Sequence, residues 1–166
     1  LFGVIDEMIE RYLFELDKQK ILFLSYSQSI FEDGEGKYKE LKDVGELIMG
    51  QSPPGSTYND KGHGMAFLQG NAEFGKINPN NIKFTTAPNK IVKKDTILIS
   101  VRAPVGDLNI ANMDYCIGRG LAGLYIEDSH LRDYVYNFLK FARSQFNKNS
   151  AGSTFKAINK NDPVSY

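Results

Sequence analysis

The chain has 166 residues, of which 42 % are hydrophobic and 12 % aromatic, enough for one folded domain with a further segment and far from a disordered composition. Its 20 basic and 20 acidic side chains give a net charge of zero, which excludes a generally basic, sticky protein. The single cysteine, Cys116, excludes a disulfide framework and is typical of a reducing cytosol, so a cytoplasmic protein is expected. Its apolar runs are too short to span a membrane.

The charges are unevenly distributed along the chain. Residues 1–46 hold six basic and eleven acidic side chains, whereas residues 47–166 hold fourteen basic and nine acidic ones. This pattern predicts an acidic N-terminal segment joined to a mildly basic body. Such a basic surface is either a solvated face or a surface for an acidic partner, and the charge pattern alone leaves both interpretations open.

Residues 1–33 are predicted to form one long helix with an apolar seam of the coiled-coil type. Apolar residues recur at alternating steps of three and four, with one polar exception. A helix of this length spans about 40 Å, too long to bury its seam against one small domain. We therefore expect it to pack on another long helix; a core helix of the same domain is the alternative. The seam consists of Phe2, Ile5, Ile9, Tyr12, Leu16, Gln19, Phe23, Tyr26 and Ile30.

Residues 34–37 contain two glycines and are predicted to be a hinge that ends the helix. The body that follows, residues 38–166, is predicted to be α+β, rich in strands, with irregular loops. Alternating or β-branched apolar residues predict five strands, at Met65–Gln69, Ile82–Thr86, Ile97–Val101, Leu108–Ala111 and Leu121–Ile126. An amphipathic helix comes next, with Asp128 or Ser129 as its N-cap. Its apolar stripe is Leu131, Val135, Phe138, Leu139, Ala142 and Phe146.

Few residues suit catalysis or metal binding. The two histidines, His63 in a glycine-flanked turn and His130 at a helix start, have no companion at metal-ligand spacing, so no metal site is predicted. Cys116 lies in an apolar, strand-like stretch and is interpreted as a small core residue rather than as the partner of His63 in a catalytic dyad. The sequence also lacks the glycine-rich loops that bind nucleotide phosphates.

Three polar loops carry residue types that contact nucleic acid. The loop over residues 50–62 is stiffened by two prolines, two amides stand at the end of a predicted strand, and residues 152–156 offer hydroxyls and a lysine. Amide and guanidinium groups can pair with base edges, and hydroxyl and cationic groups can contact phosphates. For each residue, the alternative is a role within its own loop or in the core. The DNA-contact candidates are Gln51, Ser52, Tyr58, Lys61, Gln69, Asn71, Arg102, Ser153, Thr154 and Lys156.

Five segments of the body, taken together and in order, resemble one known family. They are Gly50–Asn59, Phe67–Gly75, Asp95–Asp107, Cys116–Ala122 and Gly152–Ile158. Over about residues 40–166 the chain resembles a target recognition domain of a type I restriction–modification specificity subunit. The N-terminal seam resembles the conserved spacer helix that holds two such domains apart.

The resemblance implies a subunit that reads double-stranded DNA and is not itself an enzyme. Partner modification subunits would bind S-adenosylmethionine and methylate adenine, and a restriction subunit would use ATP and magnesium, so no cofactor is expected in this chain. With one recognition domain and one spacer helix, the chain resembles half a subunit or a fragment, and a homodimer through the seam is a possible assembly. Two alternatives stay open: a self-contained small hydrolase or transferase using the polar loops, and an assembly scaffold without DNA affinity.

Overall fold

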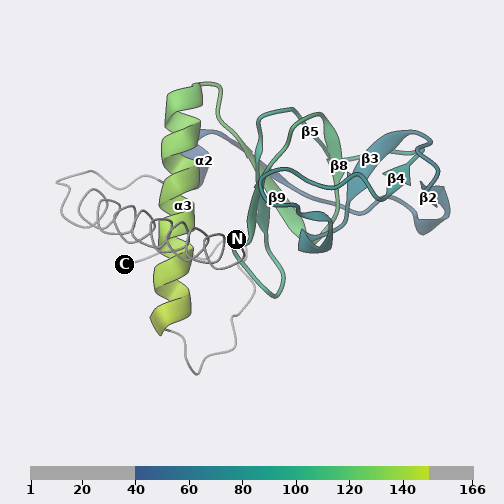
Figure 1. Ribbon diagram of the computed structural model, residues 1–166. Helices are drawn as coiled ribbons and strands as arrows, with labels where there is room; N and C mark the ends of the chain where they lie inside the picture. Colours follow the sequence, from purple (N-terminus) through teal and green to yellow (C-terminus); the bar gives the residue numbers. More distant parts are fainter. Residues whose placement is uncertain (1–39, 150–166) are drawn as a thin grey trace, which may run out of the picture. The chain divides into compact units, whose positions relative to one another are not determined.

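The computed structural model of the protein describes residues 40–149, with side chains described as far as residue 143. The chain divides into two units, Leu1–Tyr38 and Lys39–Tyr166, and every described residue belongs to the second. The predicted seam helix at 1–33, the hinge at 34–37 and the candidates Ser153, Thr154 and Lys156 lie outside the described residues. Within the described range the chain is rich in strands and ends in a long helix, as predicted (Figure 1).

Four strands form an antiparallel sheet in the order β1-β9-β6-β7, where β1 is Glu46–Met49, β9 is Leu121–Tyr125, β6 is Ile97–Ser100 and β7 is Leu108–Ile110. A short helix, α2 (Leu41–Val44), precedes β1. Both faces of β6 are covered, because Ile97 packs in one hydrophobic cluster and Leu98 in another. The apolar run at Ile97–Ser100 therefore belongs to a central strand buried on both sides, within the predicted strand Ile97–Val101.

A second sheet has the order β2-β4-β3-β8-β5. Its strands are β2 (Tyr58–Asn59), β4 (Phe84–Thr85), β3 (Met65–Leu68), β8 (Tyr115–Ile117) and β5 (Ile91–Val92). Strands β3 and β8 are parallel, with Phe67 opposite Cys116, and the other pairs are antiparallel. Leu68 and Ile117 of this sheet share a buried cluster with Leu98 and Leu121 of the first. One part of the core thus lies between the two sheets.

The long helix α3 (Ser129–Asn149) covers the other face of the first sheet, where Val135 packs with Ile97 and Leu124. Its predicted N-cap is confirmed: the backbone N–H of Leu131 donates to Asp128 Oδ1 at 2.9 Å. This hydrogen bond holds the pKa of Asp128 below its ordinary value. Leu131, predicted in the apolar stripe, is 42 % exposed, because the buried face of the helix begins one turn later.

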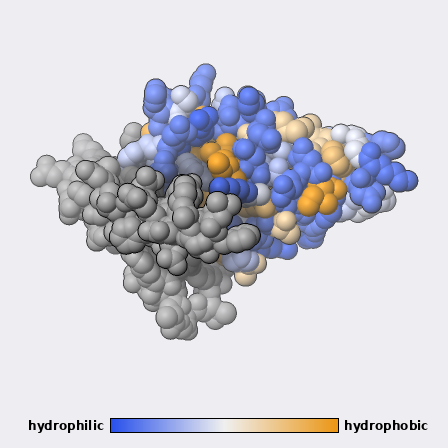
Figure 2. Space-filling view, viewed as in Figure 1, coloured by the Kyte–Doolittle hydropathy of each residue, from blue (hydrophilic) through white to orange (hydrophobic). Residues whose placement is uncertain are grey.

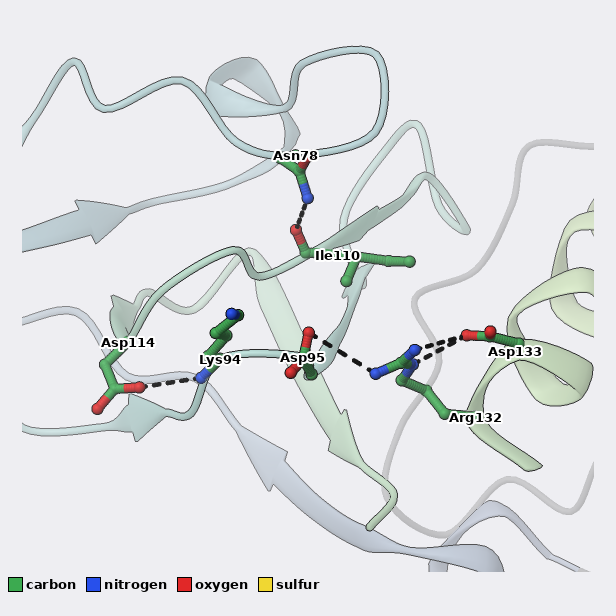
Figure 3. A network of polar contacts seen from close by, with 7 residues as sticks. All are labelled: Asn78, Lys94, Asp95, Ile110, Asp114, Arg132 and Asp133. Atoms are coloured by element: carbon green, nitrogen blue, oxygen red, sulfur yellow. Dashed lines mark hydrogen bonds and ion pairs between the residues drawn. The ribbon is translucent and has the colours of Figure 1, made fainter. Parts of the chain in front are cut away.

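A chain of polar contacts fixes the start of α3 to the loop before β6 (Figure 3). The Arg132 guanidinium lies 3.7 Å from Asp95 Oδ1 and donates to Asp133 Oδ1 at 2.8 Å. Asp95 has a φ of 68°, a left-handed conformation, and its N–H donates to the Ala111 carbonyl at 2.7 Å. Because these ion pairs are half-exposed, each contributes no more than about 1 kcal/mol, and their main effect is on orientation.

Each of the five predicted strands contains an observed one, and four further strands are present in the described range. Strands β2 and β5 have two residues each and lie in mostly polar stretches, so the sequence there shows no strand pattern. In the described part of the chain, no helix combines the length and hydropathy needed to cross a bilayer.

Candidate nucleic-acid interface

Four of the DNA-contact candidates meet in one open hollow of about 370 Å³: Ser52, Gln69, Asn71 and Arg102. They come from the loop after β1, the end of β3, the 3-10 turn η2 (Asn71–Glu73) and the loop after β6. The hollow is also lined by Gly70, Ala72, Glu73, Lys83, Arg119 and Gly120. The fold therefore gathers polar groups from segments that are distant in the sequence.

The loop after β1 is fastened to the turn between β8 and β9. The N–H of Gln51 donates to the Ile117 carbonyl at 3.0 Å, and the Ser52 hydroxyl accepts the Arg119 N–H at 3.3 Å. The Gln51 side chain is exposed and does not line the hollow, whereas the half-buried Ser52 does. Ser52 thus has a structural contact as well as a place at the site.

The end of β3 is organised by a buried carboxylate. Glu73 is 7 % exposed, and its Oε2 accepts the N–H groups of Gln69 at 3.2 Å and Gly70 at 3.0 Å. Its Oε1 lies 3.6 Å from the ammonium group of Lys83. Lys83 Nζ also donates to the Gln69 side-chain oxygen at 2.9 Å. The exposed Gln69 side chain is therefore held through its oxygen by the ion pair of Lys83 and Glu73.

The Gly118–Gly120 turn lies directly on the backbone of Gln69. The Gly120 N–H donates to the Gln69 carbonyl at 3.2 Å. A Cβ on Gly120 would lie 2.6 Å from that carbonyl oxygen, a distance that real Cβ atoms do not reach. Only glycine permits this close approach, which also presents Arg119 at the hollow.

Asn71 and Arg102 are placed by the loop that joins β6 and β7. The Asn71 amide donates to Asp107 Oδ2 at 2.6 Å. The Ser100 hydroxyl accepts the Asp107 N–H at 2.9 Å and donates to the Pro104 carbonyl at 2.7 Å, which closes the loop that carries Arg102. Asp107 also pairs with Arg143 of α3. The loop is therefore a defined structure that holds Arg102 at the hollow.

The hollow has a surplus of positive charge. Lys83, Arg102 and Arg119 line it together with one carboxylate, that of Glu73. Lys83 is paired with Glu73, but among residues 40–143 no carboxylate lies within ion-pair distance of the Arg102 or Arg119 guanidinium. Exposed guanidinium groups with no ion-pair partner among residues 40–143, beside amides, suit phosphate oxygens and base edges. Sequence reasoning did not include Lys83, Glu73 or Arg119 among the candidates.

Tyr58 and Lys61, like Gln51, do not line the hollow. The Tyr58 hydroxyl donates to the Pro53 carbonyl at 2.8 Å, and its ring packs on Phe67 at a centroid distance of 4.8 Å. Tyr58 therefore stiffens the proline loop and does not line the hollow. Lys61 is exposed on the turn between β2 and β3, where its N–H donates to the Asn59 side chain.

The described residues give no support to a cysteine or metal site. Cys116 is fully buried with Sγ 3.7 Å from Asn89 Oδ1, which confirms it as a core residue, and His63 is exposed. No cluster of potential metal ligands occurs within the described range. The visible face of that range is mostly hydrophilic, with hydrophobic side chains in small separate patches (Figure 2). Such a surface suits a polar partner.

Comparison with known proteins gives consistent matches. A protein of Methanocaldococcus jannaschii, assigned as the specificity subunit of the type I restriction enzyme MjaX, is 39 % identical over 98 % of this chain and 41 % of its own length. The HsdS subunit of Thermoanaerobacter tengcongensis has a TM-score of 0.73 at 37 % identity, covering 86 % of this chain and 38 % of that one. A solved structure from work on assembly of a type I R-M system gives the same TM-score and identity over 92 % of this chain and 40 % of its own.

The specificity subunit of M. genitalium is 18 % identical with a TM-score of 0.58, over 88 % of this chain and 41 % of that one, so the likeness there is one of fold. This chain spans about two fifths of the length of these relatives. The sequence model for the type I restriction modification DNA specificity domain matches residues 34–162, most of the chain. The chain therefore belongs to the type I restriction modification DNA specificity domain family.

Proposed function

We propose that the protein is a sequence-specific DNA-recognition module of a type I restriction–modification complex, and that it contacts double-stranded DNA at the hollow lined by Gln69, Asn71, Arg102 and Arg119. The observation that carries this proposal is the convergence of Gln69 and Asn71 with the guanidinium groups of Arg102 and Arg119 at one open site. Amides discriminate base edges, and guanidinium groups bind phosphates or guanine. Family membership supports the same function.

The proposal assigns chemistry to other subunits. The ionisable groups that line the hollow are Glu73, Lys83, Arg102 and Arg119, and the carboxylate is already engaged by backbone N–H groups and Lys83. This arrangement favours a binding surface over the active site of a hydrolase or transferase. In the proposed complex, modification subunits with S-adenosylmethionine methylate adenine, and a restriction subunit with ATP and magnesium cleaves, in the cytoplasm.

The N-terminal seam at Phe2–Ile30 is proposed to pack on a second long helix, in a homodimer or in a longer specificity subunit. Its regular apolar spacing in the sequence is the support for this part of the proposal. A homodimer would read two identical half-sites, separated by a distance that the paired helices set. Sedimentation of the full chain and of Ile9→Asp and Leu16→Asp variants tests it: the wild type is expected to dimerise and the variants to stay monomeric.

The DNA-binding proposal is tested with duplexes selected by the full chain from a randomised pool. Fluorescence anisotropy is expected to give tighter binding to a selected duplex than to its scrambled control. Arg102→Ala and Arg119→Ala should each reduce the slope of log K against log salt by about one, because each removes one phosphate contact. Lys94→Ala removes an exposed cation that does not line the hollow and should leave the slope unchanged.

Three results would contradict the proposal. If the full chain selects no sequence and binds all duplexes alike, it is a scaffold or a non-specific binder. If Lys94→Ala reduces the salt slope as much as Arg102→Ala, the contact surface lies outside the hollow. Methyl transfer by the isolated chain with S-adenosylmethionine would favour a self-contained enzyme.

A further inference from the structure

The side chain of Gln69 has its two ends in different environments. Its oxygen faces the ammonium group of Lys83 at 2.9 Å, and the residue is exposed. An ammonium group has only donors, so the amide atom that faces it must be the oxygen. The amide nitrogen, with its two N–H groups, is therefore the end that Gln69 presents outward.

Lys83 is itself fixed in place. Its Nζ lies 3.6 Å from Glu73 Oε1, whose other oxygen accepts two backbone N–H groups at the end of β3. The antiparallel register of β3 and β4, with Ala66 opposite Phe84, brings Lys83 next to this strand end. Because Glu73 is 7 % exposed, its charge needs a partner. Lys83 provides that partner, and the pairing keeps its ammonium group beside the Gln69 oxygen.

We infer that Lys83 and Glu73 are positioning residues that fix Gln69 as a hydrogen-bond donor toward DNA. This inference rests on the proposed function and specifies which end of the Gln69 amide faces the DNA. A glutamine that is free to rotate can satisfy donors and acceptors alike, whereas this one presents N–H groups. In the major groove it would select guanine N7 or O6, adenine N7 or thymine O4, and reject a cytosine facing it, which offers only its amino group.

Asn71, the second amide at the hollow, has the opposite polarity. Its nitrogen donates to the Asp107 carboxylate at 2.6 Å, and a carboxylate paired with an arginine has only acceptors. The neighbour of each amide therefore sets its orientation: a cation fixes Gln69 as a donor, and an anion leaves the oxygen of Asn71 free to accept. In both residues, the charge of the neighbour matches the end of the amide that it engages.

The test measures base preference at each position of a selected duplex for the full chain and four variants. Lys83→Met removes the ammonium group and frees the amide to rotate, so discrimination at one base pair should fall about tenfold, beyond any loss common to all sequences. Lys83→Arg keeps a donor under Gln69 and should keep the preference. Gln69→Glu replaces the donor by an acceptor and should shift the preference at that same base pair toward a facing amino group.

Lys61→Met is the matched control, because it removes one exposed lysine that does not contact Gln69. It should leave the preference at that base pair unchanged. Urea midpoints check that each variant is folded. If Lys83→Met does not fold, the change of base preference in Gln69→Glu alone tests the orientation of the amide. An unchanged preference in Lys83→Met or Gln69→Glu overturns the inference and leaves the proposed function intact. A wild-type chain without any sequence preference overturns both.

Discussion

The side-chain amide of Asn71 donates to Asp107 Oδ2 at 2.6 Å and joins two loops that are 36 residues apart. Asp107 also pairs with Arg143 of α3, the helix that packs on the four-stranded sheet. One carboxylate thus connects the hollow with the helix. The position of Asn71 at the hollow therefore depends on the packing of α3 as well as on its own turn.

This connection predicts a cost in stability when Asp107 is changed. Asp107→Ala leaves Asn71 and Arg143 without their shared acceptor and should lower the free energy of unfolding by about 1–2 kcal/mol. Asp114→Ala is the control, because Asp114 is exposed and accepts one N–H, from Lys94; its cost should stay below about 1 kcal/mol. Urea unfolding of the three proteins makes the comparison. Equal losses in the two variants would show that Asp107 contributes no more to stability than the exposed Asp114 does.

Gly120→Ala tests the close packing of the turn on Gln69. The added methyl group would meet the Gln69 carbonyl oxygen at 2.6 Å, so the turn must shift, and the free energy of unfolding should fall by about 1–3 kcal/mol. Gly55→Ala places a methyl group where no atom lies within 4 Å and should leave stability nearly unchanged. Selective DNA binding should weaken in Gly120→Ala alone. A folded Gly120→Ala protein with full selectivity would contradict the geometry described.

Asp128 gives the stability of the protein a dependence on pH. The Leu131 N–H lowers the pKa of this carboxyl below its ordinary value of 3.8, so the charged cap stabilises the fold above pH 3.8 and this stabilisation is lost as pH falls through the lowered pKa. Asp128→Ala should therefore lower the urea midpoint at pH 7, and the difference from the wild type should shrink toward pH 2. A difference that grows on acidification would contradict this account.

The strands with long apolar or alternating patterns could be predicted from the sequence, because burial against two layers leaves a clear pattern. Ile97–Ser100 is an example. The cap at Asp128 could also be predicted, because an aspartate just before an amphipathic stretch is a common N-cap. The sequence predicts no strand at β1, because Glu46–Met49 is mostly exposed. This strand forms through its backbone pairing with β9.

The residues that line the hollow can be predicted only in part, for a related reason. Ser52, Gln69, Asn71 and Arg102 carry recognisable chemistry in loops, and they meet at the hollow. Lys83 follows no motif, and only the pairing of β3 with β4 brings it beside Gln69. Tyr58 has a side chain suited to DNA contact, but its hydrogen bond to Pro53 and its ring contact with Phe67 arise from the fold. Such roles depend on contacts between distant residues, which local patterns do not contain.

Hydrogen–deuterium exchange with and without a selected duplex tests most directly that this hollow is the DNA-binding surface. Peptides covering Gln69–Glu73 and Gly118–Gly120 should exchange more slowly in the presence of the duplex, and an equal concentration of scrambled duplex should give a smaller effect. The exposed face at the start of α3, around Tyr134, should not change. Protection at α3 with none at the hollow would contradict the account.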